Sequence, residues 1–162
     1  MKDKTVLLIP GLGGSSPDHW QARWASQDTG FRIVEQSDWT APDAERWTEA
    51  LDRAVARAGG PVVLVAHSLG CALVARWVRV AQRHRYSAVK GAMLVAPADV
   101  DDVDRTPDVV RSFAPISLQA MPFRSVVAAS KDDPYIGLDR AVLFAHQWGA
   151  SFRNLGTARP CE

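Results

Sequence analysis

Ser68 is the residue whose type and surroundings most clearly predict covalent chemistry in this chain. It is the centre of the segment Ala66-His-Ser-Leu-Gly70, which matches the pattern G-x-S-x-G with alanine in the first glycine position. In that pattern a sharp strand-to-helix turn strains the backbone of the serine and lifts its hydroxyl clear of the sheet. A side chain larger than methyl at either end of the motif would collide across the turn. The motif therefore predicts a nucleophilic serine, and the alternative is a serine that only caps a helix.

A glycine-rich loop, Pro10-Gly-Leu-Gly-Gly14, follows the first apolar run of the chain. Glycines let a backbone approach a reacting carbonyl without a Cβ atom in the way. The amide of Leu69, at the start of the helix after Ser68, and the amide of Leu12 are predicted to hold the negative oxygen of an acyl-transfer intermediate. Gly11 is the second choice for the loop donor.

The same loop also allows a different interpretation, a dinucleotide-binding site. Gly11-x-Gly13-x-x-Ser16 is close to the fingerprint G-x-G-x-x-G, and Glu35 ends the second predicted strand, where a ribose-binding acid would lie. However, serine replaces the third glycine, and this hypothesis leaves Ser68 without a role. It remains the weaker alternative.

A candidate acid lies in the segment Ser130-Lys-Asp-Asp-Pro-Tyr-Ile136, directly after a predicted strand. A carboxylate at the carboxyl end of a parallel strand lies on the same sheet edge as Ser68. There it could orient a histidine and stabilise the imidazolium ion. The alternative is an aspartate that only makes a turn before proline.

Short β-rich runs alternate with helical periodicity along the chain, which favours a parallel sheet covered by helices. We therefore expect an α/β fold, a three-layer αβα sandwich of one domain over residues 1–162, with its first five strands in the order 2-1-3-4-5. The predicted strands are 5–9, 31–34, 62–66, 92–96, 125–129 and a weaker 151–155. A first helix is predicted from Ser16-Pro17, and a second is opened by Thr40-Ala-Pro-Asp43 and stopped by Gly59-Gly60. Further helices are predicted from residue 69 through the arginines at 76, 79, 83 and 85, and over 138–148. The Pro- and Asp-bearing stretch 97–123 is predicted to form a lid or binding segment.

The composition excludes several classes of partner. Lys and Arg number 19 against 18 Asp and Glu, so a net charge of +1 gives no reason to expect binding to nucleic acid or to an anionic membrane. The first apolar stretch, 6–10, is too short for a signal peptide or a membrane span. The two cysteines, Cys71 and Cys161, lack metal-ligand spacing, and we expect a cytoplasmic protein without metal or cofactor. The aspartates at 99, 101, 102 and 104 do not fit a calcium loop and are predicted to form a solvated acidic loop.

Three motifs together resemble a known family: 10-PGLGGS-15, 66-AHSLG-70 and 130-SKDDPY-135. They are similar to the small α/β-hydrolase-fold serine hydrolases related to YdeN and retinoblastoma-binding protein nine, and 35-EQSDW-39 and 95-VAP-97 are similar to bacterial members. The resemblance covers roughly residues 5–157. It implies a trimmed α/β-hydrolase fold and esterase-like hydrolysis of small acyl substrates. It also implies that Asp133, directly before proline, is the acid, with Asp132 as second choice.

The resemblance further implies a catalytic histidine in a Gly-His pair shortly after a segment like 155-LGTA-158. Here the chain continues as Arg159-Pro-Cys-Glu162, without histidine, so we expect the C-terminal catalytic segment to be missing or frameshifted. The strand-to-helix turn at Ser68 is called the elbow below, and the helix after it the elbow helix. Among the four histidines, His67 is expected to pack beside the elbow and His19 to line the pocket. His84 is expected about 24 Å along the elbow helix at 1.5 Å per residue. His146 is expected at the surface or in a groove.

These observations predict a serine hydrolase of esterase or thioesterase type, with Ser68 and Asp133 as catalytic residues and impaired activity because the base is absent. The alternative is a non-catalytic binding protein that uses the same pocket, around Gly11, His19 and His67, for a ligand or partner. Loss of a closing helix would expose apolar surface, which favours a homodimer.

Overall fold

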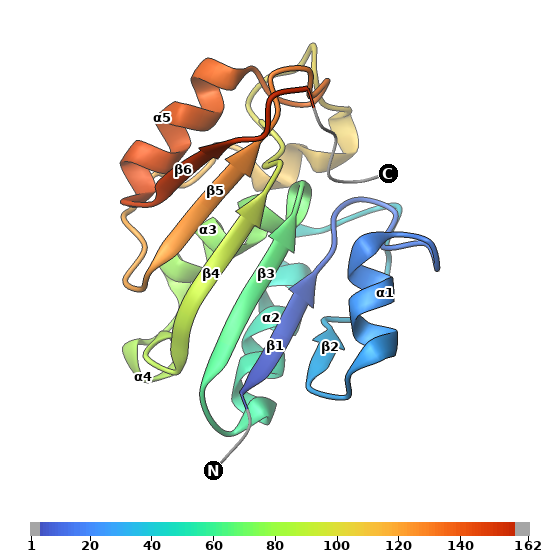
Figure 1. Ribbon diagram of the computed structural model, residues 1–162, viewed down its shortest axis with the longest axis vertical. Helices are drawn as coiled ribbons and strands as arrows, with labels where there is room; N and C mark the ends of the chain where they lie inside the picture. Colours follow the sequence, from blue (N-terminus) through green and yellow to red (C-terminus); the bar gives the residue numbers. More distant parts are fainter. Residues whose placement is uncertain (1–3, 158–162) are drawn as a thin grey trace.

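The computed structural model describes residues 4–157, which form one six-stranded parallel sheet with helices on both faces (Figure 1). Along the sheet the strands lie in the order β2-β1-β3-β4-β5-β6. Their bounds are β1 Thr5–Ile9, β2 Phe31–Ile33, β3 Val62–His67, β4 Val89–Val95, β5 Ser125–Ala129 and β6 Ser151–Asn154. This confirms the predicted strand order, and the sixth strand extends the edge next to β5.

The helices are α1 Trp20–Gln27, α2 Ala44–Ala58, α3 Leu69–Val80, α4 Arg83–Tyr86 and α5 Leu138–Trp148, with a 3-10 helix, η1, at Asp108–Phe113. Right-handed crossovers decide which face each helix covers. The step from β1 to β2 runs opposite to the later steps across the sheet, so α1 lies on one face and α2 and α3 on the other (Figure 1). Within residues 4–157 no helix is long and apolar enough to cross a membrane.

The main core lies between the sheet and the α2–α3 side. Alternate residues of β1 and β3, among them Leu7, Ile9 and Leu64, point toward this side and are at most 3% exposed. They pack with the fully buried indoles of Trp47 and Trp77. Burying such side chains stabilises the fold by about 1.5–3 kcal/mol each, so this packed layer is the rigid base on which the strand ends are held.

Local signals decide where most helices begin and end. Asp43 caps α2 by accepting a hydrogen bond from the amide of Arg46 at 3.0 Å, and Gly59 ends the helix in the left-handed conformation, with φ of +64°. Gly149 ends α5 in the same way, with φ of +71°. Each is a common termination signal because glycine has no Cβ atom to strain this conformation.

Two predicted helix boundaries are wrong. Ser16 does not cap the first helix: its carbonyl accepts from the amide of His19 in a turn, and α1 begins at Trp20 with His19 as the cap. The elbow helix does not reach His84, because the chain becomes extended at Ala81 and a separate helix, α4, begins at Arg83. The arginines predicted to lie on one helix therefore belong to two.

Candidate active site

Ser68 occupies the sharp corner between β3 and α3 that the sequence predicts. Its φ of +55° and ψ of −119° lie in a region that side chains other than glycine rarely adopt. Hydrogen bonds hold the corner from both sides: the Ser68 amide donates to the Val95 carbonyl at 3.0 Å, and the Ser68 carbonyl accepts from the Ala98 amide at 3.2 Å. The end of β4 therefore fixes the strained conformation, and the Ser68 side chain lines a pocket.

Close backbone contacts explain why small residues surround Ser68. A Cβ atom on Gly70 would overlap the Ile9 carbonyl oxygen, so α3 crosses the end of β1 at a distance that only glycine permits. A Cβ atom on Gly11 would lie 3.0 Å from the Ser68 Cβ and 3.2 Å from the Leu69 nitrogen. The glycine loop is thus pressed directly against the nucleophile elbow.

Two backbone amides beside Ser68 have no backbone acceptor within the described residues. Gly13 donates to the Trp39 carbonyl at 2.8 Å and Gly14 donates to the Gly11 carbonyl at 3.0 Å, whereas within residues 4–157 the Leu12 amide has no such acceptor. Leu69 is the first residue of α3, where amides have no partner inside the helix. Leu12 and Leu69 both line the Ser68 pocket, so their amides are the candidate donors of an oxyanion hole.

The Ser68 pocket has a volume of about 300 Å³ and is mostly apolar. Its other lining residues come from the glycine loop, the cap of α1, the end of β3, the segment after β4 and the loop after β5: Gly11, Gly14, His19, His67, Ala98, Thr106, Pro107, Val110 and Tyr135. Part of the predicted lid segment thus forms the pocket wall. A larger cavity of about 400 Å³ lies between α2, α3 and α4, but its walls carry Asp52 and Arg85 paired with one another and no activated nucleophile.

Asp133 lies buried in the loop after β5, with 9% of its surface exposed, whereas Asp132 beside it is exposed. One Asp133 carboxylate oxygen accepts from the Tyr135 amide at 2.8 Å. Burial raises the pKa of the Cys71 thiol, one turn into α3, well above its usual range, and the negative charge of Asp133 adds to this rise. The Asp133 carboxylate therefore lies near the start of the elbow helix, on the same sheet edge as Ser68.

His19 and His67 meet at the pocket wall, with ring centroids 4.9 Å apart. Burial, with a smaller contribution from the neighbouring His19, lowers the pKa of His67 to about 4. A group with so low a pKa is a weak proton acceptor near pH 7. His19 accepts from the Gln21 amide through Nδ1 at 3.2 Å, so its neutral ring carries the proton on Nε2. Neither ring is arranged as the base of Ser68.

The two remaining histidines, His84 and His146, are both exposed and neither lines the Ser68 pocket. The segment that the family resemblance compares with the catalytic Gly-His pair, residues 159–162, lies outside the described residues. A triad base for Ser68 is therefore not found within residues 4–157.

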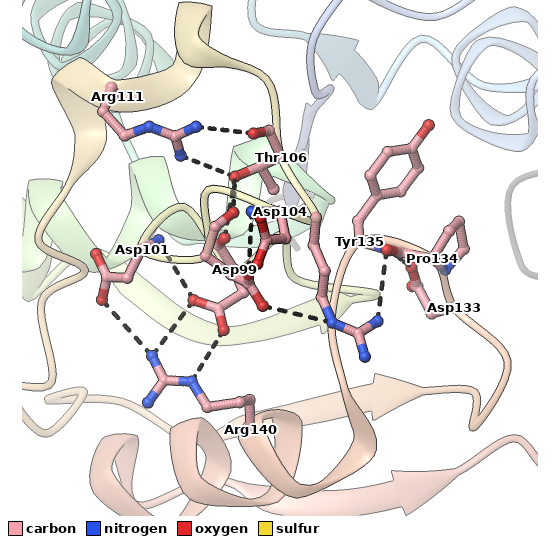
Figure 2. Close-up of polar contacts among 11 residues, drawn as sticks. Asp99, Asp101, Asp104, Thr106, Arg111, Asp133, Pro134, Tyr135 and Arg140 are labelled. Carbon is pink, nitrogen blue, oxygen red and sulfur yellow. Dashed lines mark hydrogen bonds and ion pairs between the residues drawn. The ribbon is translucent and has the colours of Figure 1, made fainter.

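The predicted solvated acidic loop is wrong for its first member. Asp99 is only 2% exposed, and Arg140 of α5 pairs with both of its carboxylate oxygens, at 2.9 and 3.3 Å (Figure 2). The hydrogen bond with Asp99 raises the pKa of Arg140 further above its usual value. The sequence around Asp99 does not mark it as buried, because its partner Arg140 is 41 residues away in sequence.

The glycine loop gives no support to the dinucleotide hypothesis. The space beside Gly11 is filled by the Ser68 elbow, α1 begins only at Trp20, and Glu35 is exposed. A phosphate would need free amides at the start of a helix that follows the glycines at once. The loop instead packs against the elbow at Ser68 and Leu69.

An open parallel sheet with a strained serine elbow and a facing glycine loop defines an α/β-hydrolase fold. The family described as "Serine hydrolase" matches residues 6–159, and the chain belongs to this family. A YdeN-like hydrolase from Pectobacterium atrosepticum is 28% identical, with a TM-score of 0.81 over 96% of this chain and 78% of its own.

Two further solved structures share the fold. The ydeN gene product from B. subtilis is 21% identical, with a TM-score of 0.67 over 94% of this chain and 85% of its own. Est1E from Butyrivibrio proteoclasticus is 12% identical, with a TM-score of 0.71 over 96% and 78%. A search of curated proteins gave no significant match. The family resemblance and the fold predicted from sequence are thereby confirmed.

Proposed function

We propose that this serine hydrolase cleaves esters or thioesters of small, uncharged acyl groups, with Ser68 as nucleophile. The observation that carries the proposal is the strained Ser68, with φ of +55°, at the wall of an apolar pocket of about 300 Å³. Among residues 4–157 no lysine or arginine lines this pocket, so these residues offer no such cation to a negatively charged acyl group. Its size and apolar walls suit a short hydrocarbon chain.

In the proposed reaction the Ser68 Oγ attacks the acyl carbonyl carbon and its proton passes to a base. The carbonyl oxygen becomes negative and accepts hydrogen bonds from the amides of Leu69 and Leu12. The alcohol or thiol leaves with a proton, and water then releases the acid from the acylated serine. Asp133 is the proposed acid member, which would orient the base and stabilise its charged form.

We further propose that the 162-residue chain turns over slowly, because none of its four histidines is placed to act as that base. In a serine protease, loss of the histidine lowers turnover on the order of 10⁶-fold, and the oxyanion hole leaves a residual rate. A binding protein that uses the same pocket is the alternative. In keeping with two scattered cysteines and a net charge of +1, a cytoplasmic location and a small-molecule partner are proposed.

A fluorophosphonate probe and p-nitrophenyl acetate test the proposal together. We expect the probe to label Ser68 slowly, the labelling to vanish in Ser68→Ala, and ester hydrolysis to be weak. Added imidazole can supply a base, so it should raise the Ser68-dependent rate, measured as the difference between the wild type and Ser68→Ala at equal imidazole.

The outcomes separate the alternatives. The binding protein would be favoured if the probe does not label Ser68 and if the wild type and Ser68→Ala hydrolyse the ester at the same rate, with or without imidazole. A high rate without imidazole, lost in Ser68→Ala, would overturn the proposed impairment and require a base elsewhere in the chain.

A further inference from the structure

The Asp99–Arg140 ion pair joins the segment after β4 to α5 (Figure 2). The Asp99 carboxylate is buried, and within the described residues Arg140 is the cation bonded to it, through Nε at 2.9 Å and Nη2 at 3.3 Å. Arg140 also lies 3.6 Å from the Asp101 carboxylate, whose other oxygen accepts from the Ile116 amide. A buried carboxylate that loses its partner is strongly destabilised, so Arg140 fixes the position of Asp99.

From Asp99 one set of hydrogen bonds leads to the pocket wall. The Thr106 hydroxyl lies 3.2 Å from the Asp99 carbonyl and 2.7 Å from the Asp102 carbonyl. Arg111 then donates to the Thr106 hydroxyl at 2.9 Å and to its carbonyl at 2.7 Å. Thr106 and the adjoining Pro107 line the Ser68 pocket, so the position of Asp99 sets where this wall stands.

A second set leads from Asp99 to the proposed acid. The Asp99 amide donates to the Tyr135 carbonyl at 3.1 Å, and the Tyr135 amide donates to the Asp133 carboxylate at 2.8 Å. Tyr135 itself lines the pocket. The pocket wall and the acid loop are thus both held through the backbone of one residue, Asp99.

We propose that Arg140 is a positioning and specificity-determining residue, which sets the acyl-chain length that the Ser68 pocket accepts through Asp99. This inference rests on the proposed function for its chemical readout. Without the guanidinium, Asp99 moves toward water, the wall at Thr106 and Pro107 loosens, and the pocket admits longer chains. The acid loop loosens in the same step, because Tyr135 loses the Asp99 amide.

The test compares the acylation of Ser68 by p-nitrophenyl acetate and by p-nitrophenyl octanoate, followed by mass spectrometry of the intact protein. In Arg140→Ala the ratio of octanoate to acetate rates should rise about 10-fold, the range in which a pocket distinguishes chain lengths. Arg140→Lys keeps the charge but loses the bidentate contact with Asp99, so its ratio should lie between those of the wild type and Arg140→Ala. If Arg140→Ala does not fold, Arg140→Lys is the variant that tests the inference.

Arg85→Ala is the matched control, because Arg85 pairs with Asp52 at 3.3 Å outside the Ser68 pocket. It should leave the acyl ratio unchanged. An unchanged ratio in both folded Arg140 variants, or an equal change in Arg85→Ala, overturns the inference.

Amide hydrogen exchange tests the same link without any chemistry at Ser68. In an Arg140 variant the segments 98–113 and 131–137 should exchange faster together, while Arg85→Ala leaves them protected. Faster exchange in only one segment, or in neither, overturns the link. If wild-type Ser68 is not acylated at all, the proposed function fails, and exchange alone still decides whether Arg140 holds the two segments.

Discussion

At the scale of residues, the site shows how neighbours change the chemistry of ordinary side chains. Ser68 differs from other serines of the chain by its backbone, strained at φ of +55° and held by bonds to the end of β4. His67, the adjacent residue, is kept neutral because burial against His19 and Trp20 opposes its charged form. Ser68 and His67 thus line the same pocket, the one with a strained backbone and the other with an imidazole that burial keeps uncharged.

The low pKa of His67 predicts a dependence of stability on pH. Its folded pKa of about 4 lies below the ordinary value of 6.5, so between these values the unfolded chain binds more protons. The contribution of His67 to the free energy of unfolding is therefore fully present above pH 6.5 and is lost as the pH falls toward 4. It amounts to at most roughly 3 kcal/mol of unfolding free energy.

Urea unfolding at pH 7.5 and 4.5 measures this contribution. His67→Asn should lose less stability between the two pH values than the wild type, whereas His84→Asn, at an exposed position, should behave as the wild type does. An equal loss in the wild type and His67→Asn would contradict the assigned cause.

At the scale of elements, the site is made where β1, β3 and α3 come closest. The carbonyl of Ile9, at the end of β1, occupies the space that a Cβ atom at position 70 would need. The glycine loop that follows β1 is pressed against Ser68 by the same approach. The distance between the glycine loop and the Ser68 turn therefore depends on the close crossing of β1 and α3.

Gly70→Ala tests this dependence. The added methyl group meets backbone that cannot move without displacing β1, so we expect a loss of about 3 kcal/mol in unfolding free energy. In the fraction that folds, labelling of Ser68 by the fluorophosphonate should be lost, because the Leu12 and Leu69 amides separate.

Gly60→Ala is the control, since nothing lies within 4 Å of a Cβ atom there. Denaturant unfolding and probe labelling should both match the wild type in this variant. A Gly70→Ala protein as stable and as reactive as Gly60→Ala would show that the close crossing is not required.

At the scale of the whole molecule, the two faces of the sheet are covered unequally. Among the helices of residues 4–157, crossover direction places only α1 on its face, where it lies against the β2 side (Figure 1). Farther along this face Val63, Met93 and Val126 are only partly buried, and Met93 and Val126 are paired neighbours in the sheet. Apolar surface of this kind is typical of an interface.

We predict that a second copy of the chain covers this face, as expected from the sequence. Sedimentation should then show a dimer that Met93→Arg dissociates, because the interface would have to bury an unpaired charge. Val103→Arg, at a loop position that is 66% exposed, should stay dimeric. A wild type that sediments as a monomer at all concentrations would refute the prediction.

The sequence by itself determined most of the elements and the sharp turn at Ser68, because these depend on nearest neighbours. The apolar run 62–66, the small residues around Ser68 and the Asp43 and Gly59 signals act within a few residues of their own positions. Strand order followed as well, since short right-handed crossovers leave few choices.

Only the tertiary structure decided which distant side chains meet. The Asp99–Arg140 pair spans 41 residues, and Asp99 looked like surface charge because no local pattern marks a buried carboxylate. The contact of His19 with His67 and the use of Thr106 and Pro107 as pocket wall likewise depend on how α1 and the segment after β4 fold onto the sheet edge. Such pairings are fixed by packing geometry, which short-range sequence patterns do not encode.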